Sequence, residues 1–128
     1  MKNNNKIFLG EFIASCFLVM VIVGSGIMAE NLTNDNAVRL LANTIATGAG
    51  LFVLITAFAN ISGAHLNPFV SLSMYLTKRI KGKELLTFIP AQILGCLLGV
   101  MLANVFFEHS IIEFLQKIEM VFIYFYQK

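Results

Sequence analysis

Residues 62–70 read Ser-Gly-Ala-His-Leu-Asn-Pro-Phe-Val, and this stretch interrupts a chain that otherwise consists mostly of long apolar segments. Its first two residues break the preceding helix, whereas Asn67 followed by Pro68 is typical of a helix N-cap and first turn. The pattern is helical from Phe69 to Tyr75, and Lys78 and Arg79 stop it. This predicts a helix of about ten residues that begins at Asn67, roughly 15 Å or half a bilayer core. Irregular backbone at membrane depth persists only where protein buries it or where it lines a wet cavity. The stretch therefore predicts a re-entrant half-helix, and a capped surface helix in an ordinary loop is the alternative.

The composition is that of a polytopic membrane protein. Of the 128 residues, 58% are hydrophobic and 12% are charged, which argues against a soluble domain. Three segments are long and apolar enough to cross a bilayer, at residues 7–28, 40–59 and 85–107. A polar connector is expected at residues 29–38. Pro90 is expected to kink the third span or to end its first turn.

Several function classes find no support in the sequence. The small net charge of +2 does not indicate a nucleic-acid partner. Cys16 and Cys96 lie inside apolar runs, so we interpret them as buried side chains rather than a disulfide framework. We find no nucleophile–base set, metal cluster or phosphate loop, so neither an enzyme nor a metal or other cofactor is expected.

Positive charge is distributed asymmetrically about the predicted spans. Two lysines precede the first span and a basic cluster at residues 78–83 precedes the third, whereas the connector at 29–38 is acidic. Because cytoplasmic loops carry the excess of Lys and Arg, this pattern predicts a multi-pass protein of the cell membrane with a cytoplasmic N-terminus.

Residues 62–70, which we call the signature segment, resemble the first signature loop of the aquaporin and glycerol-facilitator family, usually Ser-Gly-x-His-x-Asn-Pro-Ala-Val. The resemblance implies an all-α membrane fold in which residues 1–109 form the first of two inverted repeats, with three transmembrane helices and one re-entrant half-helix. It also implies a passive channel component for water or small neutral solutes, such as glycerol-like polyols or metalloid hydroxides.

The resemblance assigns pore roles within the signature segment. The side-chain amide of Asn67, held at the half-helix start by Pro68, is expected to donate a hydrogen bond to passing solute. The carbonyls of Gly63, Ala64 and His65 are expected to form a ladder of acceptors.

A constriction residue is expected on the second span. Thr47 aligns with a position that is usually aromatic in water-selective relatives, and a threonine there implies a wider, more polar aperture. The alternative is a threonine that only packs between helices.

Two polar residues inside the spans are expected to support the loop. Burying Glu11 in a bilayer costs a few kcal/mol, so it needs a partner. It begins a Glu-Phe-Ile-Ala-Ser run similar to the family's Glu-x-x-Gly-Thr. Gln92 lies in a matching Ala-Gln-x-x-Gly run. The resemblance implies that both brace the loop. The alternative makes Glu11 the proton carrier of a small multidrug-type antiporter that acts as a dimer.

Small residues in the spans suit close helix contacts. The glycines expected to pack against neighbouring helices are Gly48, Gly50, Gly95 and Gly99.

The sequence departs from the family pattern in two respects. Phe69 replaces the usual small Ala, which adds a ring where the two signature loops of the family meet. The second repeat is not found, so we expect a truncated or split gene product that needs a complementary second-half polypeptide, or self-association, to close a pore. Residues 110–128 are expected to form an amphipathic helix or an unstructured tail.

Overall fold

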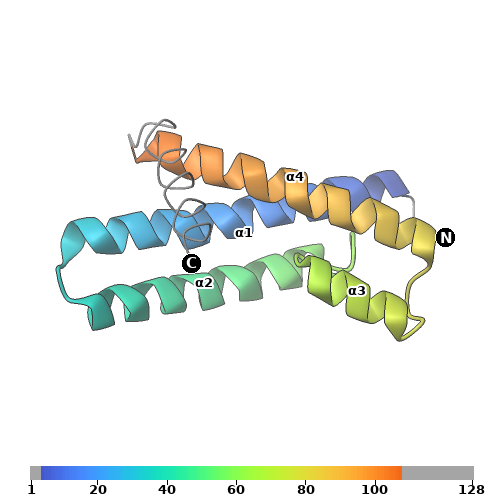
Figure 1. The fold of residues 1–128 in the computed structure, drawn as a ribbon, viewed down its shortest axis with the longest axis horizontal. Helices are drawn as coiled ribbons and strands as arrows, with labels where there is room; N and C mark the ends of the chain where they lie inside the picture. Colours follow the sequence, from blue (N-terminus) through green and yellow to red (C-terminus); the bar gives the residue numbers. More distant parts are fainter. Residues whose placement is uncertain (1–3, 108–128) are drawn as a thin grey trace, which may run out of the picture.

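A computed structural model describes residues 4–107, which form four helices and no strands. In chain order they are α1 (Asn4–Leu32), α2 (Asn36–Phe58), α3 (Pro68–Leu76) and α4 (Gly82–Phe106) (Figure 1). Helices α1, α2 and α4 are long and apolar enough to cross a membrane, which confirms the all-α prediction with three spans. The short helix predicted after Asn67 is present as α3. The tail predicted at 110–128 lies outside the described residues.

The boundary between the first two spans differs from the prediction. The connector expected at residues 29–38 shortens to residues 33–35, because α1 continues to Leu32 and α2 begins at Asn36. Asp35 caps α2 by accepting from the backbone N–H of Ala37 at 2.8 Å. The guanidinium of Arg39 donates to the Thr33 carbonyl at 2.7 Å. These polar contacts satisfy the helix ends, so both helices extend beyond the apolar core.

Pro90 was expected either to kink the third span or to end its first turn, and the second of these predictions is wrong. It lies inside α4, well past the first turn, because α4 starts at Gly82. Proline is therefore accommodated within the third span and does not end its first turn.

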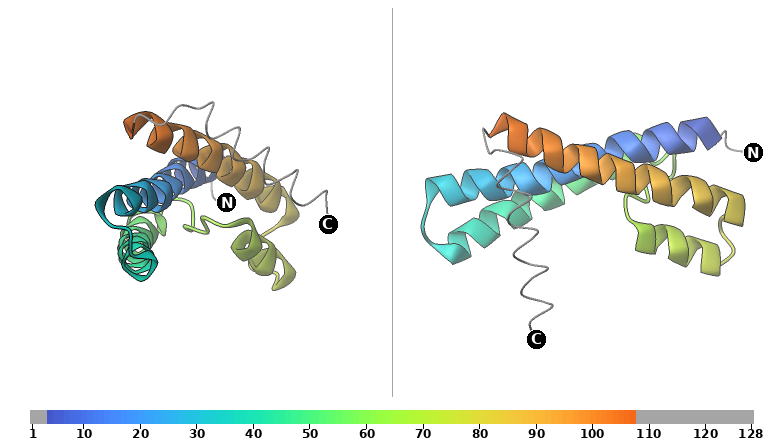
Figure 2. Two further views of the ribbon diagram at one scale, coloured as in Figure 1. Left: turned by 60° about the vertical axis from the view of Figure 1, so that its left-hand side comes forward. Right: turned by 45° about the horizontal axis from the view of Figure 1, so that its top comes forward.

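Helix α1 is the centre of the fold, since it packs against both α2 and α4, while α3 packs against α4 (Figure 2). The α1–α4 contact depends on glycine. A Cβ at Gly95 would collide with the carbonyl oxygen of Phe12, and one at Gly99 would collide with that of Cys16. Gly50 makes the corresponding contact between α2 and α1, where a Cβ would lie 3.0 Å from Val21.

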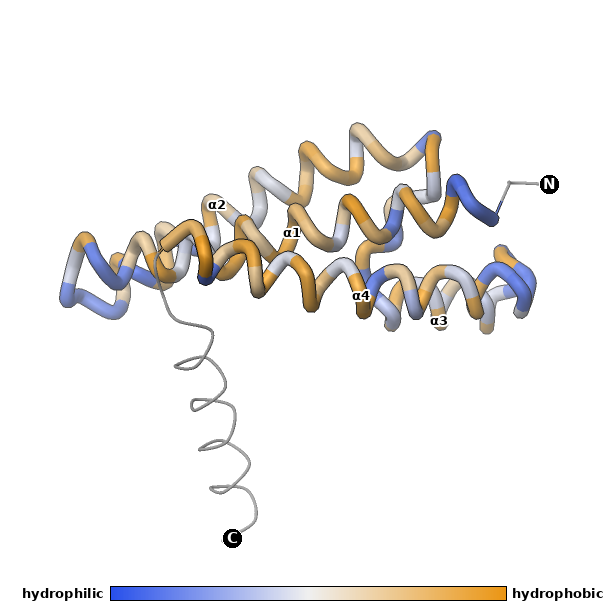
Figure 3. The backbone as a smooth tube through the Cα atoms, turned by 90° about the horizontal axis from the view of Figure 1, so that it is seen from above, coloured by the Kyte–Doolittle hydropathy of each residue, from blue (hydrophilic) through white to orange (hydrophobic). Residues whose placement is uncertain are grey.

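Gly48 contacts no neighbouring helix within residues 4–107. A Cβ built there meets no atom within 4 Å, because Gly48 faces away from α1. Indeed α2 has no buried residue at all within the described structure. The helices are apolar along most of their length and polar residues gather at their two ends (Figure 3). This is the distribution expected of a chain covered by lipid or by further protein.

Candidate functional site

The signature segment begins with a backbone turn that closes α2. The Phe58 carbonyl accepts from the N–H groups of Ile61 and Ser62, both at 3.0 Å. The chain then enters the left-handed region, with φ of 115° at Gly63, 50° at Ala64 and 53° at Leu66. For residues other than glycine this conformation costs about 1–2 kcal/mol each. Such a backbone persists only where its surroundings hold it in place.

Glu11 on α1 holds this backbone. Its side chain is completely buried. Oε1 accepts from the Ser62 hydroxyl at 2.6 Å and the His65 N–H at 3.1 Å. Oε2 accepts from the Leu66 N–H at 2.8 Å and from Nε2 of Gln92 at 2.9 Å. We call this four-donor arrangement the Glu11 cluster. It fixes two consecutive backbone N–H groups on the protein side of the loop.

Gln92 on α4 joins the Glu11 cluster to the half-helix. Its Nε2 also lies 2.9 Å from Oγ of Ser71, the one buried residue of α3. Nδ1 of His65 lies 3.0 Å from the same hydroxyl, and the imidazole stacks on Phe88 of α4 with ring centroids 4.1 Å apart. Three helices and the loop are therefore connected through side chains of this chain alone.

Asn67 takes no part in the Glu11 cluster. It is exposed, and its Oδ1 accepts from the N–H of Phe69 at 2.8 Å as the N-cap of α3. Within residues 4–107 its Nδ2 donates to no other group, and the carbonyls of Gly63 and Ala64 accept no hydrogen bond. The loop thus has N–H groups that are bonded inside the protein. It also has an amide donor and backbone acceptors without partners among the described residues.

Thr47 lies half-buried on α2, and the structure does not bring it into contact with the signature segment. It is eleven residues before Phe58, roughly 16 Å along the helix axis. Its Oγ1 lies 3.1 Å from Oδ1 of Asn43, whose Nδ2 donates to the Ile22 carbonyl of α1 at 3.0 Å. Because Oδ1 only accepts, the Thr47 hydroxyl donates to it and keeps its lone pairs for other partners.

Phe69 is 79% exposed. The crowding expected from a ring at this position is therefore not found among the described residues. Any close contact of Phe69 has to come from outside them.

Three residues that form these contacts were not predicted from the sequence, namely Ser71, Phe88 and Asn43. Ser71 occurs one helical turn after Asn67, and Phe88 one turn before Gln92, so helical spacing places each pair on one face. This spacing could have predicted the roles of Ser71 and Phe88. Asn43 could have been noticed only as a polar residue inside an apolar span, which is weaker evidence.

Comparison with known proteins agrees with this geometry. Residues 1–124 match the sequence model of the family described as Major intrinsic protein. Aquaglyceroporin AqpS of Rhizobium meliloti (strain 1021) is 42% identical over 110 residues, covering 86% of this chain and 47% of the relative. Aquaporin A of Dictyostelium discoideum is 37% identical over 94 residues, 73% of this chain and 34% of the relative. Aquaporin-4 of Rattus norvegicus is 31% identical over 94 residues, with coverages of 73% and 29%. The chain spans about half the length, or less, of these curated relatives.

Proposed function

The chain belongs to the major intrinsic protein family, and from that premise we propose that it forms one half of a passive pore for water or small neutral solutes. The relatives that it matches are named as aquaporins and an aquaglyceroporin. The three long apolar helices fit a multi-pass membrane protein.

The observation that carries the proposal is that the signature segment combines bonded N–H groups with polar groups that have no partner among the described residues. The buried Glu11 cluster holds the loop N–H groups on one side, which leaves the Asn67 amide and the carbonyls of Gly63 and Ala64 for a solute. A water or hydroxyl group needs both a donor and an acceptor to replace its hydration. The N-terminus of α3 carries a partial positive charge, which disfavours cations and protons beside it.

We further propose that Thr47 contributes to the selectivity constriction and admits polyols or metalloid hydroxides. Its hydroxyl offers lone pairs, and the neighbouring Gly48 leaves space that no described side chain fills. An aromatic ring at the same position would narrow the aperture. Selection by a small polar residue therefore suits a solute larger than water.

We propose that a complementary second half, or a second copy of the chain, closes the pore. The side of α2 that faces away from α1 and the start of α3 at Phe69 are apolar and exposed within the described residues.

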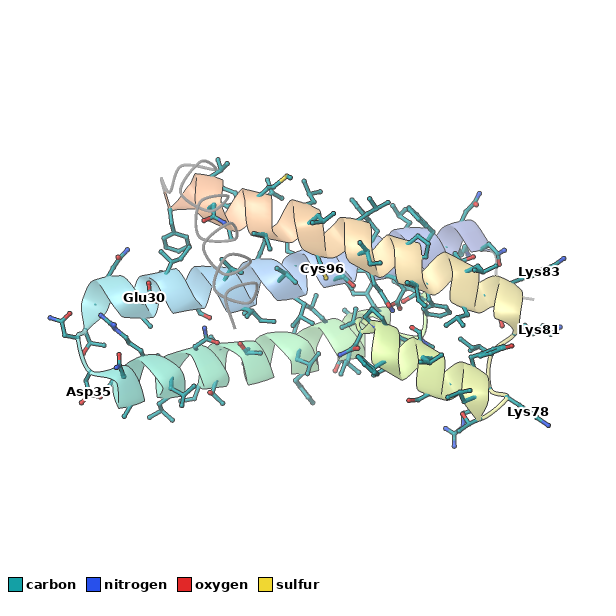
Figure 4. The ribbon with its side chains drawn as sticks, viewed as in Figure 1. Glu30, Asp35, Lys78, Lys81, Lys83 and Cys96 are labelled. Carbon is teal, nitrogen blue, oxygen red and sulfur yellow. The ribbon has the colours of Figure 1, made fainter. Side chains whose placement is uncertain are left out.

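We propose a cytoplasmic N-terminus in the cell membrane. Lys78, Lys81 and Lys83 lie at the end of the molecule where α1 starts, and Glu30 and Asp35 lie at the other end (Figure 4). The positive-inside rule then orients the basic end toward the cytoplasm.

The alternative of a proton-coupled antiporter finds no support in the geometry. A proton carrier has to meet water from alternate sides, whereas Glu11 is fully buried and both of its oxygens are occupied by donors of the same chain. The arrangement suits a carboxylate that supports the loop.

The test is stopped-flow light scattering on proteoliposomes under osmotic steps with water and glycerol. The purified chain is reconstituted alone and together with a separately expressed C-terminal half of the Rhizobium meliloti relative. Asn67→Asp keeps the capping oxygen but removes the amide donor, and Asn60→Asp is the matched control at an exposed loop position. We expect at least a tenfold loss of permeability with Asn67→Asp and none with Asn60→Asp. A folded assembly that conducts neither solute in either preparation overturns the proposal.

A further inference from the structure

The end of α3 is fixed by an unusual helix stop. The N–H of Lys78 donates to the Tyr75 carbonyl at 2.9 Å, and the N–H of Arg79 donates to the Met74 carbonyl at 2.8 Å. This is the Schellman pattern, in which the left-handed residue is usually glycine, but here it is Lys78 with φ of 60°. The motif occupies the last carbonyls of α3 and fixes the backbone from which Arg79 projects.

Four cations follow one another closely at this stop. They are Lys78, Arg79, Lys81 and Lys83, and all four are exposed. The one nearby carboxylate, Glu84, accepts from the backbone N–H of Lys81 at 2.7 Å as part of the α4 cap. None of the four side chains forms an ion pair with another described residue. Among the described residues, the basic cluster is therefore a positive surface without ion-pair partners, and its lysines lie at one end of the spans (Figure 4).

An apolar groove of about 360 Å³ runs from this cluster along α3. Phe69 and Val70 line it near the start of the helix, Ser73 and Met74 in the middle, and Arg79 at the basic end. Helix α3 has nine residues, so it is roughly 13 Å long, close to the ~15 Å hydrocarbon depth of one leaflet. The groove thus joins a cationic end at headgroup level to an apolar end near the bilayer midplane.

We propose that this groove binds one anionic phospholipid, with its phosphate on Arg79 and Lys78 and an acyl chain along α3 as far as Val70. A guanidinium matches the oxygens of a phosphate in a bidentate fashion, and clustered Lys and Arg beside a span attract anionic lipids. A choline headgroup carries the same phosphate but adds a positive charge, which the basic cluster repels. The site therefore selects phosphatidylglycerol over phosphatidylcholine.

The experiment is native mass spectrometry of the purified full chain in a neutral detergent, titrated with phosphatidylglycerol or phosphatidylcholine of equal chain length. Three variants separate the contributions. Lys78→Gln combined with Arg79→Gln removes the headgroup site. Val70→Trp fills the groove but keeps every charge. Lys6→Gln is the control, because Lys6 lies at the same end but lines a different groove with Leu9 and Phe58.

We expect phosphatidylglycerol to bind at least tenfold more tightly than phosphatidylcholine. The double variant and Val70→Trp should each lose at least tenfold, and Lys6→Gln should bind as the unmodified chain does. Equal losses for Lys6→Gln and the double variant would show diffuse attraction to positive charge and overturn the site. Full competition by millimolar inorganic phosphate, or unchanged binding in Val70→Trp, would overturn the role of the acyl chain. None of these measurements depends on conduction.

Discussion

Replacing Glu11 by Gln tests how the signature segment is held. The substitution keeps the shape of the side chain but turns one acceptor oxygen into an NH₂ group, so two of the four donors of the Glu11 cluster lose their acceptor. At about 1.5–3 kcal/mol for each bond to a charged group, the loss is roughly 3–6 kcal/mol. Part of it is recovered, because the Ser62 hydroxyl can rotate and Gln92 can turn its unpaired Oε1 toward the new NH₂. One backbone N–H, that of His65 or Leu66, is left without an acceptor. We therefore expect a net cost of about 2–4 kcal/mol.

The assay is amide hydrogen exchange of the reconstituted chain, read at His65 and Leu66. Since each 1.4 kcal/mol is a factor of ten, exchange at these amides should accelerate roughly 30- to 1,000-fold. Glu84→Gln is the control, because Glu84 also accepts from a backbone N–H, that of Lys81, but far from the loop. It should leave both loop amides unchanged. Native exchange rates in Glu11→Gln, together with a changed proton flux in proteoliposomes, would refute the supporting role and favour the antiporter.

Four further substitutions probe the helix contacts and the proposed pore lining. Gly95→Ala places a Cβ against the Phe12 carbonyl oxygen and should lower the free energy of unfolding by about 1–3 kcal/mol. Gly48→Ala meets no described atom and should be neutral or slightly stabilising. Both are measured as unfolding midpoints in detergent. Asn67→Ala removes the cap of α3, about 1 kcal/mol, as well as the solute donor, so permeability and stability should both fall; a native midpoint would contradict the capping role. Thr47→Phe should reduce glycerol permeability at least tenfold while water still passes, and equal losses of both would show that Thr47 does not discriminate by size.

The elements that could be predicted from the sequence are those set by local chemistry. A bilayer-length apolar run specifies a helix whatever it packs against, so three such runs predicted three spans. Asn67 and Pro68 specify a helix start because one supplies the capping oxygen and the other has no N–H to lose. Similarly, a carboxylate such as Glu11 inside a span predicts that hydrogen-bond donors surround it, but the sequence does not identify those donors.

The rest depended on tertiary placement. The length of an apolar run does not show how far polar residues extend a helix into water. The predicted connector before Asn36 was therefore longer than the one in the structure. Gly48 and Gly50 are two residues apart, and only the rotation of α2 about its axis decides which of them meets α1. Ser71 is a common residue in an ordinary helix pattern, and its place between Gln92 and His65 exists only after α3 has packed on α4.

The location of the loop's support bears on how a conduction experiment is read. The left-handed backbone at Ala64 and Leu66 costs about 1–2 kcal/mol per residue, and the Glu11 cluster, which offsets this cost, is made of groups of the described residues. The backbone of the signature segment is therefore held by this chain itself, whereas the side of α2 that faces away from α1 and the start of α3 at Phe69 are exposed among the described residues. Absence of permeability in the chain alone, with native exchange at His65 and Leu66, consequently reports an unclosed pore rather than a misfolded loop. Permeability that returns on addition of a complementary half then measures assembly of the two halves. The contribution of the loop structure and that of assembly can thus be separated.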